Sequence, residues 1–408
     1  MLNKRNFIII SLFPITFIIL GFIFNTPKEI INGIHSIIVH PDGLLVDYIE
    51  VGCIGAAFVN SGMLMLILIL ATYFLKIDIN GPLIAGIFTV GGFAFIGKNI
   101  YNVWPIFIGG VIYAQFKKIE FKSIFVPIMF ATALSSVVTF FSFQQNSIPL
   151  GILSGIIIGI LVPAMMVQMF KFHDGYNLYN IGFTCGILGA FFAALLRGFD
   201  FTLEPQSVLS TEYSDILMIL KLALFTIILL VDFMLKGFSL KKYKTLLTRS
   251  GKGLVDQIEF LGFRYTYANM GFIGLITTLY VILVKGEFNG PIVAGILTAV
   301  GFAAFGKHPK NCIPIMAGVF LGGYFMKYDL SSTSIIIASL FGTTLAPIAG
   351  VYGTIPGVIA GVLHVAMVNI TGEFHGWLNL YNNGFAGGIV AAFLLPVYNS
   401  VFKKKIED

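Results

Sequence analysis

Charged side chains are scarce in this chain, since Asp, Glu, Lys and Arg together make up 11% of its 408 residues. Soluble globular domains carry about 25% charged residues. Hydrophobic residues make up 57% of the chain, and the mean hydropathy is +0.92. This composition excludes an ordinary soluble domain. It predicts a multi-pass protein of the cell membrane, with the lipid bilayer as its surroundings.

Cysteines and catalytic motifs are also scarce. Cys53, Cys185 and Cys312 are far apart and lie in or beside apolar runs. Their spacing fits neither a metal site nor a redox pair, so we interpret them as small buried side chains. The chain contains no H-E-x-x-H, P-loop or G-x-S-x-G motif. We therefore expect no metal, no cofactor and no enzyme activity.

The net charge of +6 comes from lysines and arginines that lie in loops between apolar runs. This is the pattern of cytoplasmic loops in membrane proteins, so it predicts orientation rather than a nucleic-acid partner. Lys4 and Arg5 precede the first apolar run, and Lys403 to Lys405 follow the last one. We therefore predict that both termini are cytoplasmic.

An internal duplication organises the chain. Residues Asn80 to Lys98 read NGPLIAGIFTVGGFAFIGK, and Asn289 to Lys307 read NGPIVAGILTAVGFAAFGK. Each copy predicts a helix that is capped by its asparagine and has proline in its first turn. The apolar part is well below the roughly 20 residues of a full span. We therefore predict a short helix in each copy, which either re-enters or crosses the membrane.

The duplication divides the chain into five segments. They are an N-terminal span and polar loop (1–46), repeat 1 (47–199), a linking span and basic cytoplasmic loop (200–255), repeat 2 (256–397) and a basic cytoplasmic tail (398–408). A single linking span makes the second repeat begin on the opposite side of the membrane. We predict an all-α polytopic transmembrane helix bundle of about ten full spans. It contains two inverted-topology repeats, each with a pair of short helices.

A second polar stretch is also repeated. Phe172 to Phe183 read FHDGYNLYNIGF, and Phe374 to Phe385 read FHGWLNLYNNGF. Their uncharged donors and acceptors suit contact with a polar solute, and their imidazoles titrate between about pH 5 and 8. The alternative is a loop at headgroup level, in which Asn180 and Asn382 cap the next helices. The candidate site residues are His173, His375, Asn177, Asn379, Tyr179 and Tyr381.

Six further residues are candidates because a polar group at membrane depth is costly and commonly functional. We expect the free N–H groups beside Asn80 and Asn289 to meet a solute, since a helix N-terminus offers donors and a positive dipole end. Lys98 and Lys307 follow the short helices and become interfacial anchors instead if those helices cross the membrane. The remaining two, Asn60 and Asn269, lie inside full spans and either join helices or line a path.

The Asn-Gly-Pro helices, the Tyr-Asn-x-Gly-Phe motifs and the inverted plan resemble the arrangement of urea transporters. That resemblance implies two opposed halves around one pore. The paired histidines His173 and His375 resemble the twin histidines of ammonium transporters. Over its whole length the chain is similar to an uncharacterised family of bacterial polytopic membrane proteins.

These patterns together favour a transporter or channel for a small polar solute, either neutral and amide-like or anionic. The solute would move passively or with an ion through a path between the repeats. One alternative is a membrane-embedded enzyme that acts on a lipid-linked substrate, with its polar groups on one membrane face. Another is a non-transporting assembly or sensor protein with a closed interior. Association into a homo-oligomer stays open.

Overall fold

The computed structural model describes residues 4–234, 238–253 and 255–402, and these are almost entirely helical. Within these ranges, nine helical stretches are long and apolar enough to span a membrane. The predicted all-α polytopic helix bundle is therefore confirmed. Lys403 to Lys405 and the end of the linking span at Leu235 lie outside the described residues.

The two halves contain the same order of α-helices, and the first half has two additional short elements, η1 and η3. The first half holds α3 (Tyr48–Val51), α4 (Ile54–Phe74), α5 (Gly81–Phe93), α6 (Trp104–Lys117), η1 (Phe121–Ser123), α7 (Phe125–Ala131), η2 (Thr132–Leu134), α8 (Ser135–Thr139), η3 (Phe140–Gln144), α9 (Ile148–His173) and α10 (Asn180–Gly198). The second half holds α13 (Gln257–Leu261), α14 (Phe263–Leu283), α15 (Gly290–Phe302), α16 (Pro309–Phe325), α17 (Thr333–Gly342), η4 (Thr343–Leu345), α18 (Ala346–Tyr352), α19 (Thr354–Phe374) and α20 (Asn382–Val401).

The remaining elements lie outside the repeats. They are α1 (Lys4–Phe24), α2 (Pro27–Val39), β1 (Leu45–Val46), β2 (Ser207–Val208), α11 (Ser214–Met234) and α12 (Leu240–Leu246), and the two short strands pair in parallel. A polar loop was predicted after the first span, but Pro27–Val39 of that segment form the helix α2, so this part of the prediction is wrong. Thr26 and Glu29 form a capping box there, and Pro27 occupies the first turn.

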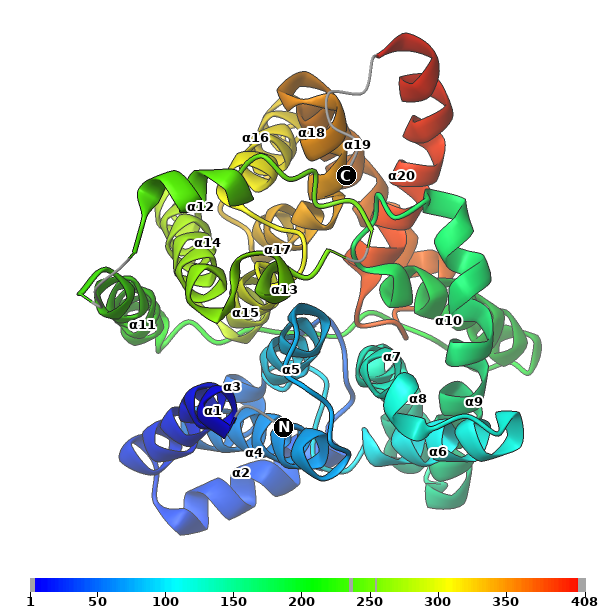
Figure 1. Ribbon diagram of the computed structural model, residues 1–408. Helices are drawn as coiled ribbons and strands as arrows, with labels where there is room; N and C mark the ends of the chain where they lie inside the picture. The colour runs from blue at the N-terminus through cyan, green and yellow to red at the C-terminus, as the bar shows by residue number, and fades with distance from the viewer. Residues whose placement is uncertain (1–3, 235–237, 254, 403–408) are drawn as a thin grey trace.

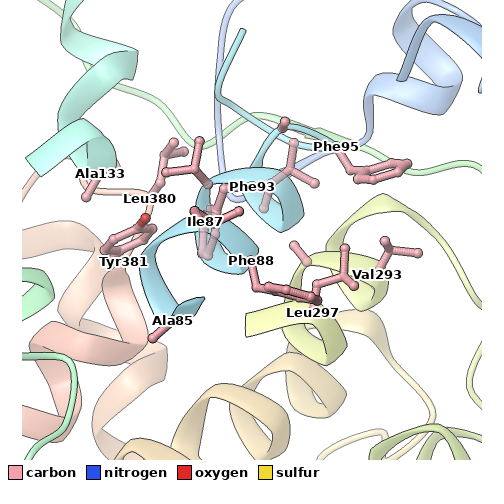
Figure 2. Close-up of a cluster of buried hydrophobic side chains, with 14 of the residues drawn as sticks. Ala85, Ile87, Phe88, Phe93, Phe95, Ala133, Val293, Leu297, Leu380 and Tyr381 are labelled. Carbon is pink, nitrogen blue, oxygen red and sulfur yellow. The ribbon is translucent and has the colours of Figure 1, made fainter. Parts of the chain in front are cut away.

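The two short helices pack against each other near the centre of the molecule (Figure 1). A Cβ atom on Gly92 would lie 3.0 Å from the carbonyl of Ala294, and one on Gly301 would lie 3.2 Å from Cα of Ala85. The start of each helix therefore meets the end of the other, so α5 and α15 are antiparallel. Figure 2 shows Phe88 of α5 against α15. Each helix is 13 residues long and ends inside the protein.

In each half, one stretch long enough to span a membrane is interrupted, namely Phe125–Gln144 and Thr333–Tyr352. In the first half a 3-10 turn, η2, separates α7 from α8, and a π-helix, η3, follows. In the second half the 3-10 turn η4 separates α17 from α18. The freed carbonyl of Ala133 accepts from Leu380 N (2.9 Å), and that of Thr344 accepts from Leu178 N (3.0 Å). Each broken helix is therefore tied to the opposite repeat.

Candidate functional site

Two cavities lie where the halves meet. The first, here called the aromatic cavity, has a volume of about 470 Å³ and an almost entirely apolar wall. Its phenylalanine rings are Phe93, Phe130, Phe170, Phe302, Phe305 and Phe341. Tyr179 and Tyr381 also line it, one from each repeated polar stretch. The tyrosine predictions therefore fall on a cavity wall.

The second, here called the polar cavity, has a volume of about 460 Å³. Its polar lining includes Asp42, Ser136, Gln144, Glu204, His375 and Asn379. Asn383 lines both cavities, and within the described chain it is the one residue that the two linings share. The cavities therefore approach each other at the start of α20.

The two predicted lysines lie beside the aromatic cavity. The side chains of Lys98 and Lys307 are both 0% exposed, which rules out interfacial anchors. Lys98 Nζ donates to the Tyr381 hydroxyl and lies 4.4 Å from that ring's centroid. Lys307 Nζ donates to the Tyr179 hydroxyl (2.6 Å) and to Thr343 Oγ1 (2.7 Å). Each lysine therefore lies behind a tyrosine of the opposite repeat.

No carboxylate forms an ion pair with either lysine among the described residues. Aromatic rings supply part of the missing stabilisation, since Lys98 lies 5.4 Å from Phe93 and Lys307 lies 5.3 Å from Phe302. Burial lowers the pKa of both lysines, so an anion bound at the cavity wall would favour their charged form and would be attracted by it.

Asn60 and Asn269 hold the ends of the short helices in place. The amide of Asn60 donates to the carbonyls of Ala94 (2.8 Å) and Lys98 (2.9 Å). The amide of Asn269 makes the equivalent bonds to Ala303 and Lys307. Neither asparagine lines a described cavity, so of the two predicted roles, joining helices fits the geometry.

The short-helix N-termini differ from the prediction. Asn80 and Asn289 do cap their helices, since each side chain accepts from an N–H in the first turn. However, Asp256 accepts from Gly81 N (3.0 Å), and Asp47 accepts from Gly290 N (2.8 Å). Donors expected to be free for a solute are therefore bonded to an aspartate of the opposite half.

Two other helices, α10 and α20, begin with backbone N–H groups that have no acceptor among the described residues. We call such helix starts open. At α10 and α20 the N-cap residues Tyr179 and Tyr381 give no side-chain acceptor. No described group accepts from the backbone N–H of Ile181 or Asn383, and both residues line the aromatic cavity. The positive ends of two long helices therefore face this cavity.

The predicted capping by Asn180 and Asn382 is wrong, because histidines take their side-chain oxygens. His173 Nε2 lies 3.0 Å from Asn180 Oδ1, and His375 Nε2 lies 3.0 Å from Asn382 Oδ1. Each imidazole also contacts a phenylalanine ring, His173 that of Phe183 and His375 that of Phe385, so both histidines have a structural role. His375 lines the polar cavity, whereas His173 lines neither described cavity.

Titration of His375 between pH 5 and 8 is not expected. Burial lowers the pKa of His375 to about 4, although its bond to Asn382 opposes the shift. The ring therefore stays neutral through that range.

Asn177 and Asn379 join the repeats. Asn177 Nδ2 donates to the carbonyl of Gly384 (3.0 Å), and Asn379 Nδ2 donates to that of Gly182 (3.2 Å). A Cβ atom on Gly182 would lie only 3.2 Å from Cα of Gly384, so the starts of α10 and α20 touch there. These asparagines position the cavity wall.

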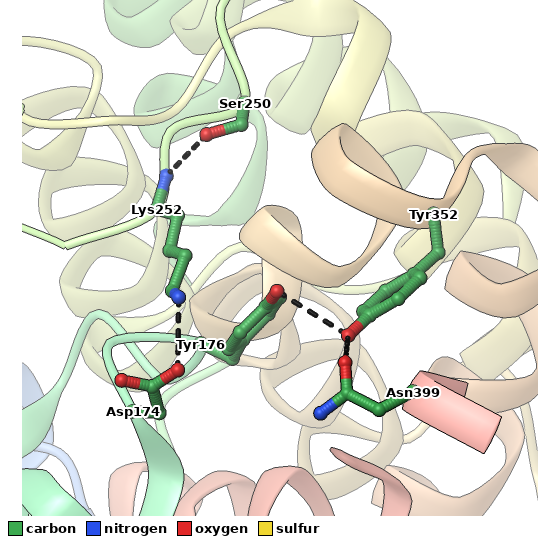
Figure 3. A network of polar contacts seen from close by, with 6 residues as sticks. All are labelled: Asp174, Tyr176, Ser250, Lys252, Tyr352 and Asn399. Carbon is green, nitrogen blue, oxygen red and sulfur yellow. Dashed lines mark hydrogen bonds and ion pairs between the residues drawn. The ribbon is translucent and has the colours of Figure 1, made fainter. Parts of the chain in front are cut away.

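A polar network fixes the turn that leads from α9 into this region (Figure 3). Lys252 Nζ donates to Asp174 Oδ2 (2.9 Å), and Tyr176 donates to the hydroxyl of Tyr352 (3.3 Å). Tyr352 in turn donates to Asn399 Oδ1 (2.7 Å). The turn after α9 is therefore held by the loop before repeat 2 and by α18 and α20.

Asp42 is an ionisable group in the polar cavity that the sequence analysis missed. It accepts from the Tyr48 hydroxyl and from Asn102 Nδ2 (2.9 Å). Burial raises the pKa of Asp42 to about 7, although hydrogen bonds from Thr139, Tyr48 and Asn102 oppose the shift. The folded protein therefore favours the protonated carboxyl.

This shift predicts a pH-dependent stability. The pKa of Asp42 is higher in the folded protein than in the unfolded chain. Its contribution to the free energy of unfolding is therefore greatest below about pH 4. That contribution falls by up to roughly 4 kcal/mol as the pH rises through about 7. Thermal unfolding in detergent should compare wild type with Asp42→Asn. Burial also raises the pKa of Asp47, to about 6, but both proteins share that term. An unchanged stability difference from pH 4 to 8 would contradict the prediction.

The fold and this arrangement define a membrane-embedded helical protein with two cavities at a repeat interface. The chain belongs to the family described as "Protein of unknown function (DUF1576)", whose model matches residues 26–198 and 235–400. No curated protein and no solved structure matched the chain. The comparisons give no support to the resemblance to urea transporters.

Proposed function

We propose that this protein is a transporter or channel that moves a small solute with a hydrogen-bond acceptor, preferentially an anion, between its two repeats. The observation that carries the proposal is the meeting of the two cavities at Asn383. We call the residues around this junction, namely the two tyrosines, the lysines behind them and the starts of α10 and α20, the partition.

The predicted orientation places the cavities on opposite membrane faces. The aromatic cavity is lined by Pro82 at the start of α5, Val126 at the start of α7 and Phe170 near the end of α9. With a cytoplasmic N-terminus, all of these ends are on the inner side. The polar cavity is lined by residues 42–45, by residues 202–206 and by the end of α19. Those segments are on the outer side.

The charges at the partition favour an anion. Lys98 and Lys307 have no described carboxylate partner and would carry positive charge beside a bound anion, and the open starts of α10 and α20 add two positive dipole ends. Helix N-termini directed at an anionic group recur in secondary transporters. A cation would meet repulsion from the two dipole ends and would gain no stabilisation from the lysines.

The mirrored placement of these groups favours transport over the two alternatives. An enzyme acting on a lipid-linked substrate would need its polar groups on one face, yet Lys98 and Lys307 occupy equivalent places in both halves. A sensor with a closed interior would not need two large cavities. We therefore propose that the protein is not an enzyme.

Cysteine labelling from each side of the membrane tests this proposal. In a Cys53→Ser background, whose other cysteines are buried, Ser334→Cys places a thiol in the polar cavity and Val126→Cys places one in the aromatic cavity. A membrane-impermeant thiosulfonate should modify position 334 from outside only and position 126 from inside only. The control is Ile359→Cys, which lies on the exposed apolar surface of α19 and lines neither cavity. A thiol there would face lipid, so the impermeant reagent should not modify it from either side. Labelling of 334 and 126 from the same side would contradict the proposal.

A further inference from the structure

The junction of the two cavities carries a polar pair that the duplication does not explain. Asn383 Oδ1 lies 3.0 Å from Nε2 of His364, a residue of α19. In the first repeat the equivalent positions hold Ile181 and Val162. The surrounding residues are repeated, so this pair is a specific departure from the symmetry.

The amide of Asn383 is oriented toward the cavities. Asn383 is 97% buried, with an exposed fraction of 3%, and its oxygen is engaged by His364. That contact makes His364 Nε2 the donor, so the amide nitrogen points away from the histidine. No acceptor for Asn383 Nδ2 is found in the part of the chain that the structure describes, and the residue lines both cavities. This amide nitrogen can therefore donate to a molecule in the cavities.

His364 fixes this orientation. Its side chain is fully buried, and its Nδ1 has no partner among the described residues. A Cβ atom on Gly342 would lie 2.8 Å from the His364 ring, so α17 packs closely on it. The imidazole is therefore held by packing on one side and by the amide on the other.

The aromatic cavity next to this donor sets the shape of the ligand. Its wall is formed by phenylalanine and tyrosine rings, and its volume of about 470 Å³ is ample for a body of several carbon atoms. A fully hydrated inorganic ion would lose its water against such a wall without enough replacement partners. An organic acid would place its apolar body against the rings and its carboxylate at the polar junction.

We propose that Asn383, positioned by His364, binds the anionic group of a small organic acid whose apolar body occupies the aromatic cavity. This inference rests on the proposed transport function and names the solute class. The Asn383 amide and the open starts of α10 and α20 supply the donors, while Lys98 and Lys307 supply the positive potential.

Equilibrium binding of radiolabelled benzoate to the full-length protein in detergent tests this inference without any transport. Asn383→Ile, which introduces the residue of the first repeat, should raise the Kd by at least about tenfold through loss of a hydrogen bond to a charged group. Asn369→Leu removes an amide that lines the polar cavity but not the aromatic cavity, and it should leave the Kd within about twofold. Benzoate bound by Asn383→Ile with wild-type affinity would overturn the assignment.

Two further measurements separate binding from folding. Asn383→Asp keeps the side-chain size and repels the ligand, so it should lose benzoate binding while its unfolding temperature stays near that of Asn383→Ile. His364→Gln should retain most of the binding, because it still offers a donor, whereas His364→Leu should lose it. Equal binding by both His364 variants would remove the positioning role.

Competing ligands test the solute class. Benzamide should displace benzoate at least about tenfold more weakly than unlabelled benzoate does, and benzylamine should not displace it. Absence of benzoate binding by the wild type, or equal competition by benzylamine, would overturn the inference. Cysteine labelling from the two sides of the membrane does not depend on this ligand. It would therefore still test whether the two cavities open on opposite sides.

Discussion

Replacing Lys307 by methionine should lower benzoate uptake into proteoliposomes by at least about tenfold. Methionine keeps the length and apolar stem of lysine but removes the amine that would carry a positive charge behind Tyr179 when an anion is bound. A unit charge about 8 Å from a carboxylate, at an effective dielectric constant of about 20, contributes on the order of 2 kcal/mol. Lys98→Met should act alike because it removes the equivalent charge behind Tyr381. The double variant should show a loss of roughly a hundredfold if the two charges act independently.

Lys221→Met is the matched control for these variants. Lys221 is also a buried lysine beside a phenylalanine ring, since its Nζ lies 5.3 Å from the centroid of Phe17, but it lines neither described cavity. Its replacement should leave uptake within about twofold. Equal losses for Lys221→Met and Lys307→Met would mean that buried lysines act through folding, and the electrostatic account would be wrong.

Asp47→Ala should reduce the free energy of unfolding by about 3–5 kcal/mol, the largest stability effect we expect. The Asp47 side chain is 0% exposed and accepts from the backbone N–H groups of Ile49 (2.8 Å), Gly290 (2.8 Å) and Ser210 (3.3 Å). Alanine would leave these donors buried without partners and would release the start of α15 from the first half. Denaturant unfolding in mixed micelles measures the change.

Asp256→Ala provides the comparison within the same molecule. Asp256 makes the equivalent contact to Gly81 N and also caps α13, but it is only half-buried. Water can reach the groups that its loss exposes, so the expected cost is about 1–2 kcal/mol. A larger loss for Asp256→Ala than for Asp47→Ala would contradict the role assigned to burial.

The short helices could be predicted because their signals are local. Asn80 and Asn289 stand directly before Gly-Pro, so cap, first turn and limited length all follow from one stretch. The aspartates that occupy the neighbouring donors could not be found this way. Asp47 and Gly290 are 243 residues apart, and Asp256 and Gly81 are 175 apart. Only the folded packing of the repeats joins them.

The polar repeats were identified, but the roles within them were misassigned. Asn180 has the sequence context of an N-cap, yet its side-chain oxygen bonds to His173 because the turn after α9 brings them together. The helix start is thereby left open. For Asn383 a signal was available, since it departs from Ile181 in an otherwise repeated stretch. A departure from internal symmetry was the missing clue.

The breaks in α7–α8 and α17–α18 had no clear sequence signal. Both stretches are apolar enough on average to span a membrane, and the breaks fall at Thr132–Leu134 and Thr343–Leu345, with Pro347 shortly after the second one. The interruptions persist because backbone groups of the opposite repeat take the freed carbonyls of Ala133 and Thr344. Such compensation in membrane proteins occurs where irregular backbone is buried in protein or lines a cavity.

Uptake by the wild-type protein is the most direct test of the central claim, that a solute passes between the repeats through the partition at Asn383. Purified full-length protein is reconstituted into liposomes, and uptake of radiolabelled benzoate is compared with that of liposomes without protein and with Asn383→Ile. The transport account predicts saturable uptake by the wild type that exceeds protein-free leakage and is strongly reduced in the variant. Wild-type uptake no faster than leakage, with benzoate still bound at equilibrium, would contradict it and favour a binding or sensing role.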